Sequence, residues 1–102
     1  HYVVEGTTFE LNSATGKVLL AYTDDSLELK KEIEKKGYIF TTGERLDNIA
    51  SVAIPAFDNK NVFKATVSVS GWKQFFTNKT VPKYFKTLSS YSNQLKTLLS
   101  NE

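Results

Sequence analysis

The run from Gly43 to Gly71 contains two stretches rich in small and apolar residues, and in the second of them Thr66, Ser68 and Ser70 alternate with apolar residues. This pattern predicts two strands. Asn59-Lys60-Asn61 divides the run and has the composition of a turn. We therefore expect a β-hairpin between Ala50–Asp58 and Val62–Ser70. A shorter stretch, Tyr38–Thr42, predicts one more strand before it.

Three other stretches have the residue spacing of helices. The first runs from Lys17 to Tyr22 and takes Ser13 or Thr15 as its N-terminal cap. The second spans Ser26–Lys36, and Gly37 supplies its C-terminal stop. The third begins at Val81-Pro82, with the proline in its first turn. Its apolar residues recur every third or fourth position and predict one buried face: Tyr84, Leu88, Tyr91, Leu95 and Leu98.

The predicted elements follow in the order strand, helix, helix, strand, strand, strand, helix. Residues 2–5 are the end of the opening strand. Hairpin-linked strands flanked by helices indicate an α+β fold with an antiparallel sheet and helices packed on it. The chain has 102 residues, of which 40% are hydrophobic and 24% charged, and this fits a single domain spanning 1–102. It contains no methionine and starts in a predicted strand, so we expect it to be part of a longer protein.

Composition and charge exclude several classes of function. The net charge is +2 with both signs interspersed, so no nucleic-acid-binding patch is predicted. No apolar run approaches the roughly 18 residues that span a bilayer, so we expect no membrane partner. The absence of cysteine excludes disulfides and thiolate chemistry. It also fits a reducing compartment, which predicts a cytoplasmic protein.

The sequence offers no catalytic group. His1 is the only histidine, which argues against a histidine metal site or a Ser-His nucleophile. Glu44, Asp47 and Asp58 flank the two strands, where carboxylates are more often solvated or capping residues than an acid–base pair. We therefore predict no enzyme activity, no metal and no cofactor.

One face of the predicted hairpin carries small side chains. Thr66, Ser68 and Ser70 share a face of the second strand because side chains alternate along a strand. Ile49 and Ser51 share a face of the first strand in the same way. A face of this kind leaves room for a small molecule, which the hydroxyls would bond. The alternative is that a helix packs closely on it.

Three segments, taken in order, resemble the C-terminal effector-binding domain of IclR-family transcriptional regulators. They are 13–21 (SATGKVLLA), Gly37-Tyr38, and the run from Glu44 through NI, VAIPAFD and ATVSVSG to Gly71. The resemblance implies a GAF- or PAS-like sheet with helices packed on it, of which this chain holds only a part if the family's opening strands are absent. Tyr22–Lys36 is shorter than the family's usual insertion, and this shortening would remove part of a lid or pocket wall.

The resemblance also implies an effector pocket. The family positions that line it match Ala14, Thr15, Ile49, Ser51, Ser68 and Ser70, and Thr41 matches a position that is acidic in some members. Ala14-Thr15-Gly16 would begin the first helix, where backbone N–H groups and the helix dipole favour an anion. A pocket with hydroxyls and no fixed charge predicts a small organic acid or a hydroxylated metabolite as the ligand.

We therefore predict a ligand-sensing and oligomerisation domain of a transcriptional regulator. The resemblance implies homo-oligomers, either dimers or tetramers, and DNA binding only through a winged helix-turn-helix domain outside this sequence. The aromatic cluster from Trp72 to Phe76 either closes the core or forms a contact between protomers. The alternative function is a dimerisation module whose degenerate pocket binds no ligand.

Overall fold

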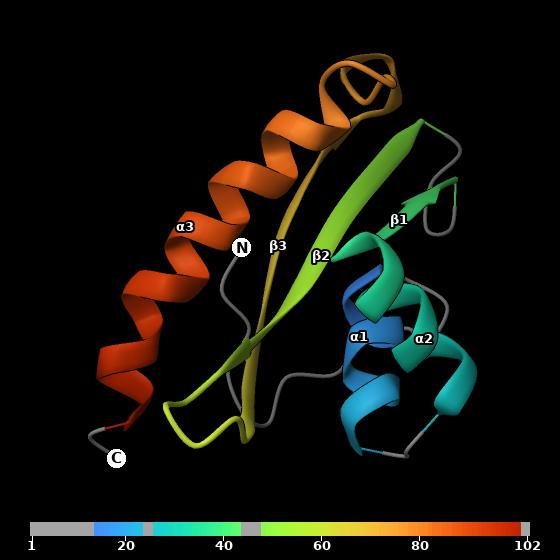
Figure 1. Ribbon diagram of the computed structural model, residues 1–102. Coiled ribbons are helices and arrows are strands. Elements are labelled where there is room, and N and C mark those ends of the chain that lie inside the picture. Colours follow the sequence, from blue (N-terminus) through green and yellow to red (C-terminus); the bar gives the residue numbers. More distant parts are fainter. Residues whose placement is uncertain (1–13, 24–25, 44–47, 101–102) are drawn as a thin grey trace.

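The computed structural model describes residues 14–23, 26–43 and 48–100, and these form helices packed on an antiparallel sheet. The elements follow in this order: α1 (Ala14–Thr23), α2 (Leu27–Lys36), β1 (Ile39–Thr42), β2 (Ile49–Phe57), β3 (Phe63–Trp72), η1 (Lys73–Phe75) and α3 (Val81–Ser100). The three-stranded sheet has the order β1-β2-β3, and both pairs of neighbours are antiparallel. α3 runs diagonally along one face, while α1 and α2 lie on the other (Figure 1). The predicted α+β fold is confirmed, and the predicted strand at 2–5 lies outside the described residues.

The start of α1 differs from the prediction. The helix begins at Ala14, so Thr15 lies in its first turn and is not the cap; Ser13 lies outside the described residues. The Thr15 side chain turns to the sheet instead, where its hydroxyl donates a hydrogen bond to Ser68 Oγ at 3.2 Å. Contact between α1 and the sheet therefore decides the role of this threonine, and a cap preference read from local sequence does not foresee it.

Gly37 ends α2 as predicted. Its φ of 92° lies in the left-handed region, and its N–H donates to the carbonyl of Ile33 at 2.6 Å. Glycine adopts this conformation without a steric penalty, which makes it the common residue at this position of a helix. The chain then turns directly into β1.

The predicted hairpin is confirmed, and its turn is held by Asp58. One oxygen of this carboxylate, Oδ1, accepts the backbone N–H groups of Lys60 at 2.8 Å and Val62 at 3.0 Å. The bond from Val62 is the main reason that the pKa of Asp58 lies below its ordinary value of 3.8. Asn61 supplies the left-handed residue of the turn, with φ of 63°.

Each face of the sheet has its own core, because side chains of β2 and β3 alternate between the faces. The face under α3 buries one cluster: Val52, Ile54, Ala56, Ala65, Val67, Val81, Leu88 and Leu99. The face under α1 and α2 buries another: Ala14, Val18, Ala21, Ile33, Ile39 and Ala53. The second cluster contains mostly small side chains, which allow α1 to lie close to the sheet.

The buried face of α3 is rotated from the predicted one. Tyr91 and Leu98 were expected in the core, yet Leu98 is 64% exposed and Tyr91 is also exposed. The predicted Leu88 is buried and Leu95 packs against the same cluster, but Val81 and Leu99 complete the stripe that meets the sheet. The sequence has leucines at 95, 98 and 99, so its periodicity fits either stripe, and only the contact with the sheet selects one. None of the helices described is long and apolar enough to cross a membrane.

Candidate ligand-binding site

Hydroxyl side chains form a row across all three strands on the face that carries α1. The strand register pairs Thr41 of β1 with Ser51 of β2, and Ser51 with Ser70 of β3. The site residues predicted on three separate stretches of sequence therefore lie side by side on the sheet. Thr41 is buried, Ser51 is half-buried and Ser70 is exposed, so the row opens to solvent toward β3.

Ser51 and Ser70 bond each other, with 2.6 Å between their hydroxyl oxygens. A hydroxyl carries one hydrogen and two lone pairs, and this pair shares a single hydrogen bond. The pair therefore keeps one O–H group and several lone pairs for a further partner. Such a pair can donate to a carboxylate oxygen or accept from a ligand hydroxyl.

The next row of the sheet lies beneath α1. Ser68 of β3 pairs with Ala53 of β2, and Ser68 is only 3% exposed. Ala14 and Gly16 of α1 are also buried, and their small size lets the helix approach the sheet where Thr15 bonds Ser68. α1 therefore packs closely over Ser68, which is the second of the two alternatives for the small-residue face. The Ser51–Ser70 pair remains accessible.

The first turn of α1 contributes the electrostatics of the site. Ala14, Thr15 and Gly16 form this turn, and it holds no acidic side chain. A helix N-terminus carries a partial positive charge, so an anion near it is favoured. An oxygen-rich anion is the kind of group that hydroxyl rows beside a helix N-terminus would favour.

Beyond the hydroxyl row, Ile49 of β2 pairs with Trp72 of β3. The neighbouring residue, Gly71, faces α3: a Cβ added to it would lie 3.5 Å from the ring of Phe76, and Phe76 packs against the cluster under α3. Trp72 must therefore lie on the other face, together with Ser70. Its side chain is 57% exposed.

A groove of about 500 Å³ opens at this end of the sheet. The described residues that line it are Asn48, Trp72, Lys73 and Gln74. The backbone N–H of Lys73 donates to the carbonyl of Asn48 at 2.6 Å, which ties the start of β2 to the end of β3. From the sequence, Trp72 was assigned only to an aromatic cluster. However, Trp72 lies an even number of positions after Ser68 and Ser70, and this spacing already predicts that all three share a face.

The rings of that aromatic cluster differ in burial, and only Phe76 takes the core role that was expected. Phe76 packs against the core under α3 and stands 4.9 Å from the ring of Tyr84, measured between centroids. Trp72 and Phe75 are exposed, Phe75 by 53%. The cluster thus closes the core with one ring and presents two others to solvent.

The described titratable groups with a shifted pKa lie away from this site. Asp58 lies in the hairpin turn, and Tyr22 lies at the other end of α1 from Thr15, against Phe57 and Phe63. Burial is the main cause that raises the pKa of Tyr22 above 10.0. Within the ranges described, no group of three or more histidine, cysteine, aspartate or glutamate residues could hold a metal ion.

Comparison with known proteins gives one family. Residues 26–97 match the family model described as "Bacterial transcriptional regulator IclR C-terminal". This region contains Thr41, Ile49, Ser51, Ser68 and Ser70. No curated protein sequence matches the chain.

Solved structures share the fold at low sequence identity. An IclR transcriptional regulator from Alicyclobacillus acidocaldarius has a TM-score of 0.76 and 22% identity, over 93% of this chain and 48% of its own. The IclR of Thermotoga maritima has a TM-score of 0.74 and 22% identity, over 96% of this chain and 52% of its own. A double mutant of the PobR inducer-binding domain from Acinetobacter, in complex with 3-hydroxybenzoic acid, has a TM-score of 0.65 and 14% identity, over 82% of this chain and 63% of its own. The chain therefore spans about half the length of the first two structures.

Proposed function

We propose a sensor function on one premise: the chain belongs to the IclR family of bacterial transcriptional regulators, whose C-terminal domain it matches over 26–97. In this proposal the domain binds a small organic acid on the sheet face beside α1. The bound acid changes how protomers are arranged, and so changes DNA binding by a winged helix-turn-helix domain outside this sequence.

The Ser51–Ser70 pair carries the proposal. Its two hydroxyls lie 2.6 Å apart on an accessible part of the sheet, in register with Thr41. A carboxylate is a strong acceptor for hydroxyl and backbone N–H donors, and charge-assisted bonds of this kind are about twice as strong as neutral ones. The 3-hydroxybenzoic acid bound by the Acinetobacter PobR domain is an organic acid, which supports the same ligand class here.

The proposed partners follow from the same premise. We place this chain in a cytoplasmic homo-oligomer, either a dimer or a tetramer, that binds DNA through its other domain. Linkage requires that the factor by which the acid changes DNA affinity equals the factor by which DNA changes acid affinity. Measuring both affinities on the complete regulator therefore tests the coupling.

Thermal unfolding in the presence of small carboxylic acids tests acid binding by the chain itself. An acid at about 100 times its dissociation constant adds about 2.7 kcal/mol to the free energy of unfolding. At about 4–8 °C per kcal/mol for a domain of this size, the melting temperature should rise by roughly 10–20 °C.

A double variant, Ser51→Ala with Ser70→Ala, locates the binding site. It should remove most of this rise, because it deletes both accessible hydroxyls and leaves α1 and Ser68 in place. Ser90→Ala, on the exposed surface of α3, is the matched control and should keep the full rise. An equal rise in the double variant would show that the acid binds elsewhere, and no rise with any acid would refute the sensor function.

A dimerisation module without a ligand is the second candidate. It is favoured because the hydroxyls of the site already form hydrogen bonds with one another: Thr15 bonds Ser68, and Ser51 bonds Ser70. In that case light scattering should show a stable oligomer, and no acid should shift its melting temperature.

A further inference from the structure

We infer that the acid carries a planar ring, that Trp72 selects it by contacting this ring, and that the Lys73 ammonium attracts the anion from the open end of the site. This inference rests on the proposed function and names the ligand class of the same site. Neither Trp72 nor Lys73 belongs to the set of site positions that the sequence suggested.

Trp72 lies next to the hydroxyl pair, on the same face of the sheet. It is two residues after Ser70 on the same face of β3, so the two side chains are about 7 Å apart along the strand. A ring bound against Trp72 therefore places a carboxylate substituent within reach of Ser70 and Ser51. The side chain of Ile49, across the strand pair from Trp72, provides an apolar neighbour for the same ring.

The exposure of Trp72 makes it a suitable platform. More than half of its surface, 57%, faces solvent, although tryptophan is the largest apolar side chain in the protein. An aromatic ligand that covers it removes apolar surface from water and gains offset or edge-to-face ring contact. An acid of two or three carbons would reach the hydroxyls and leave the indole uncovered.

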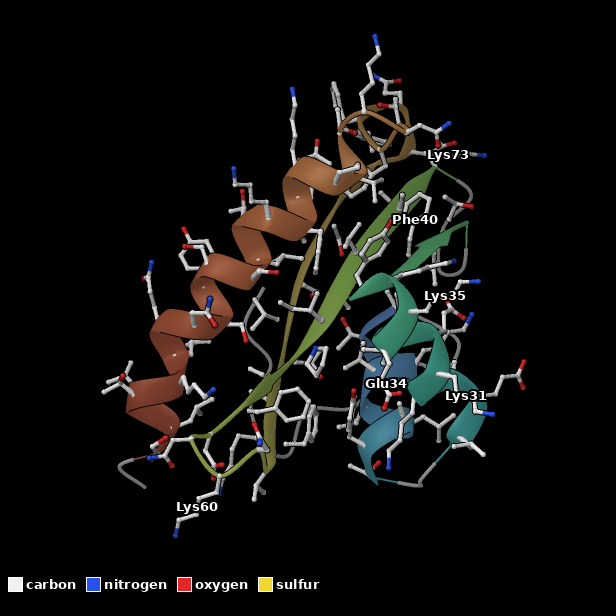
Figure 2. The ribbon with its side chains drawn as sticks, viewed as in Figure 1. Lys31, Glu34, Lys35, Phe40, Lys60 and Lys73 are labelled. Atoms are coloured by element: carbon white, nitrogen blue, oxygen red, sulfur yellow. The ribbon has the colours of Figure 1, made fainter. Side chains whose placement is uncertain are left out.

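Lys73 supplies the only charge among the described residues that line the groove. Its backbone is fixed by the bond to Asn48. Figure 2 shows Lys73 at the end of the sheet, extending to the side on which α1 and α2 lie. An ammonium at this rim attracts an anionic ligand, and the attraction weakens as salt is added.

The groove also has the size for such a ligand. Its volume of about 500 Å³ falls within the range of about 300–1,000 Å³ that small-molecule sites occupy. Its described lining combines an indole, two amides and an ammonium, so apolar and polar contacts are both available. This composition suits a ring with a polar substituent better than a hydrocarbon or a short acid.

Tryptophan fluorescence gives a direct readout, because Trp72 is the only tryptophan in the chain. The probes are benzoate, cyclohexanecarboxylate, which has a ring of similar size without aromatic faces, and acetate, which has no ring. Benzoate should change the emission of Trp72 and raise the melting temperature, cyclohexanecarboxylate should act more weakly, and acetate should leave the emission unchanged.

Two variants and a control assign the effect. Trp72→Leu should weaken benzoate binding about 3- to 10-fold, the loss expected for one aromatic contact. Lys73→Met should weaken it about 2- to 5-fold at low salt and reduce its salt dependence. Phe75→Leu, at an aromatic residue that is 53% exposed but does not line the groove, should bind benzoate as the unaltered chain does.

The outcomes separate this inference from the proposed function. If acids raise the melting temperature through Ser51 and Ser70 but leave Trp72 emission unchanged, or if Trp72→Leu binds benzoate as tightly as the unaltered chain, the ring inference is overturned and the sensor function stands. If no acid raises the melting temperature, both are overturned.

Discussion

Gly37→Ala should destabilise the protein strongly, because Gly37 meets two constraints at once. Its φ of 92° is strained for any residue with a Cβ. A Cβ built there would also lie 2.8 Å from Phe85 Cε1 and closer still to Phe85 Cζ. The substitution would therefore push Phe85 away from Tyr38, whose ring centroid lies 5.2 Å from its own.

The loss in free energy of unfolding is the sum of a backbone contribution and a ring-contact contribution. The left-handed conformation costs an alanine about 1–2 kcal/mol, and the lost ring contact costs about 0.5–1.5 kcal/mol. The free energy of unfolding should therefore fall by about 1.5–3.5 kcal/mol, and the melting temperature by roughly 6–28 °C. Denaturant and thermal unfolding followed by circular dichroism measure both quantities.

Gly71→Ala is the matched control for this substitution. Gly71 has no positive φ, and its added Cβ would touch Phe76 at an ordinary 3.5 Å. The same chemical change should therefore be neutral or stabilise by up to about 1 kcal/mol, because alanine loses less backbone entropy than glycine on folding. If Gly37→Ala proves as mild as Gly71→Ala, the reasoning from the backbone angle and the Phe85 contact is refuted.

Three further outcomes test the packing and the turn. Thr66→Val should stabilise by about 1 kcal/mol in denaturant unfolding, because the buried Thr66 hydroxyl finds no hydrogen-bond partner in the described part of the chain. Leu99→Ala should cost about 2–5 kcal/mol and Leu98→Ala less than about 0.5 kcal/mol, since the two are 5% and 64% exposed; equal losses would contradict the buried face of α3. Asp58 has a lowered pKa, so its contribution to stability is present above its ordinary value of 3.8 and is lost as the pH falls through the folded value. The free energy of unfolding, measured as a function of pH, should fall less on acidification in Asp58→Asn than in the unaltered chain.

Much of the candidate site could be predicted because strand geometry is local. Side chains two residues apart share a face of a strand whatever the rest of the fold does, so Ser68 and Ser70 were correctly placed together. The turn at Asn59-Lys60-Asn61 then brought Ser51 opposite Ser70. The same rule places Trp72 on this face, but its aromatic neighbours suggested a cluster and hid its position.

The order of the elements, the hairpin and the glycine that ends α2 follow from local sequence, because each depends on residues that are close along the chain. The tertiary fold sets which hydroxyls are covered, since α1 lies over Ser68 and leaves the Ser51–Ser70 pair accessible. It also decided that α3 buries Leu99 and exposes Leu98. These choices depend on contacts between segments far apart in sequence, and the free energy of burial against the sheet selects among faces that the local pattern leaves nearly equal.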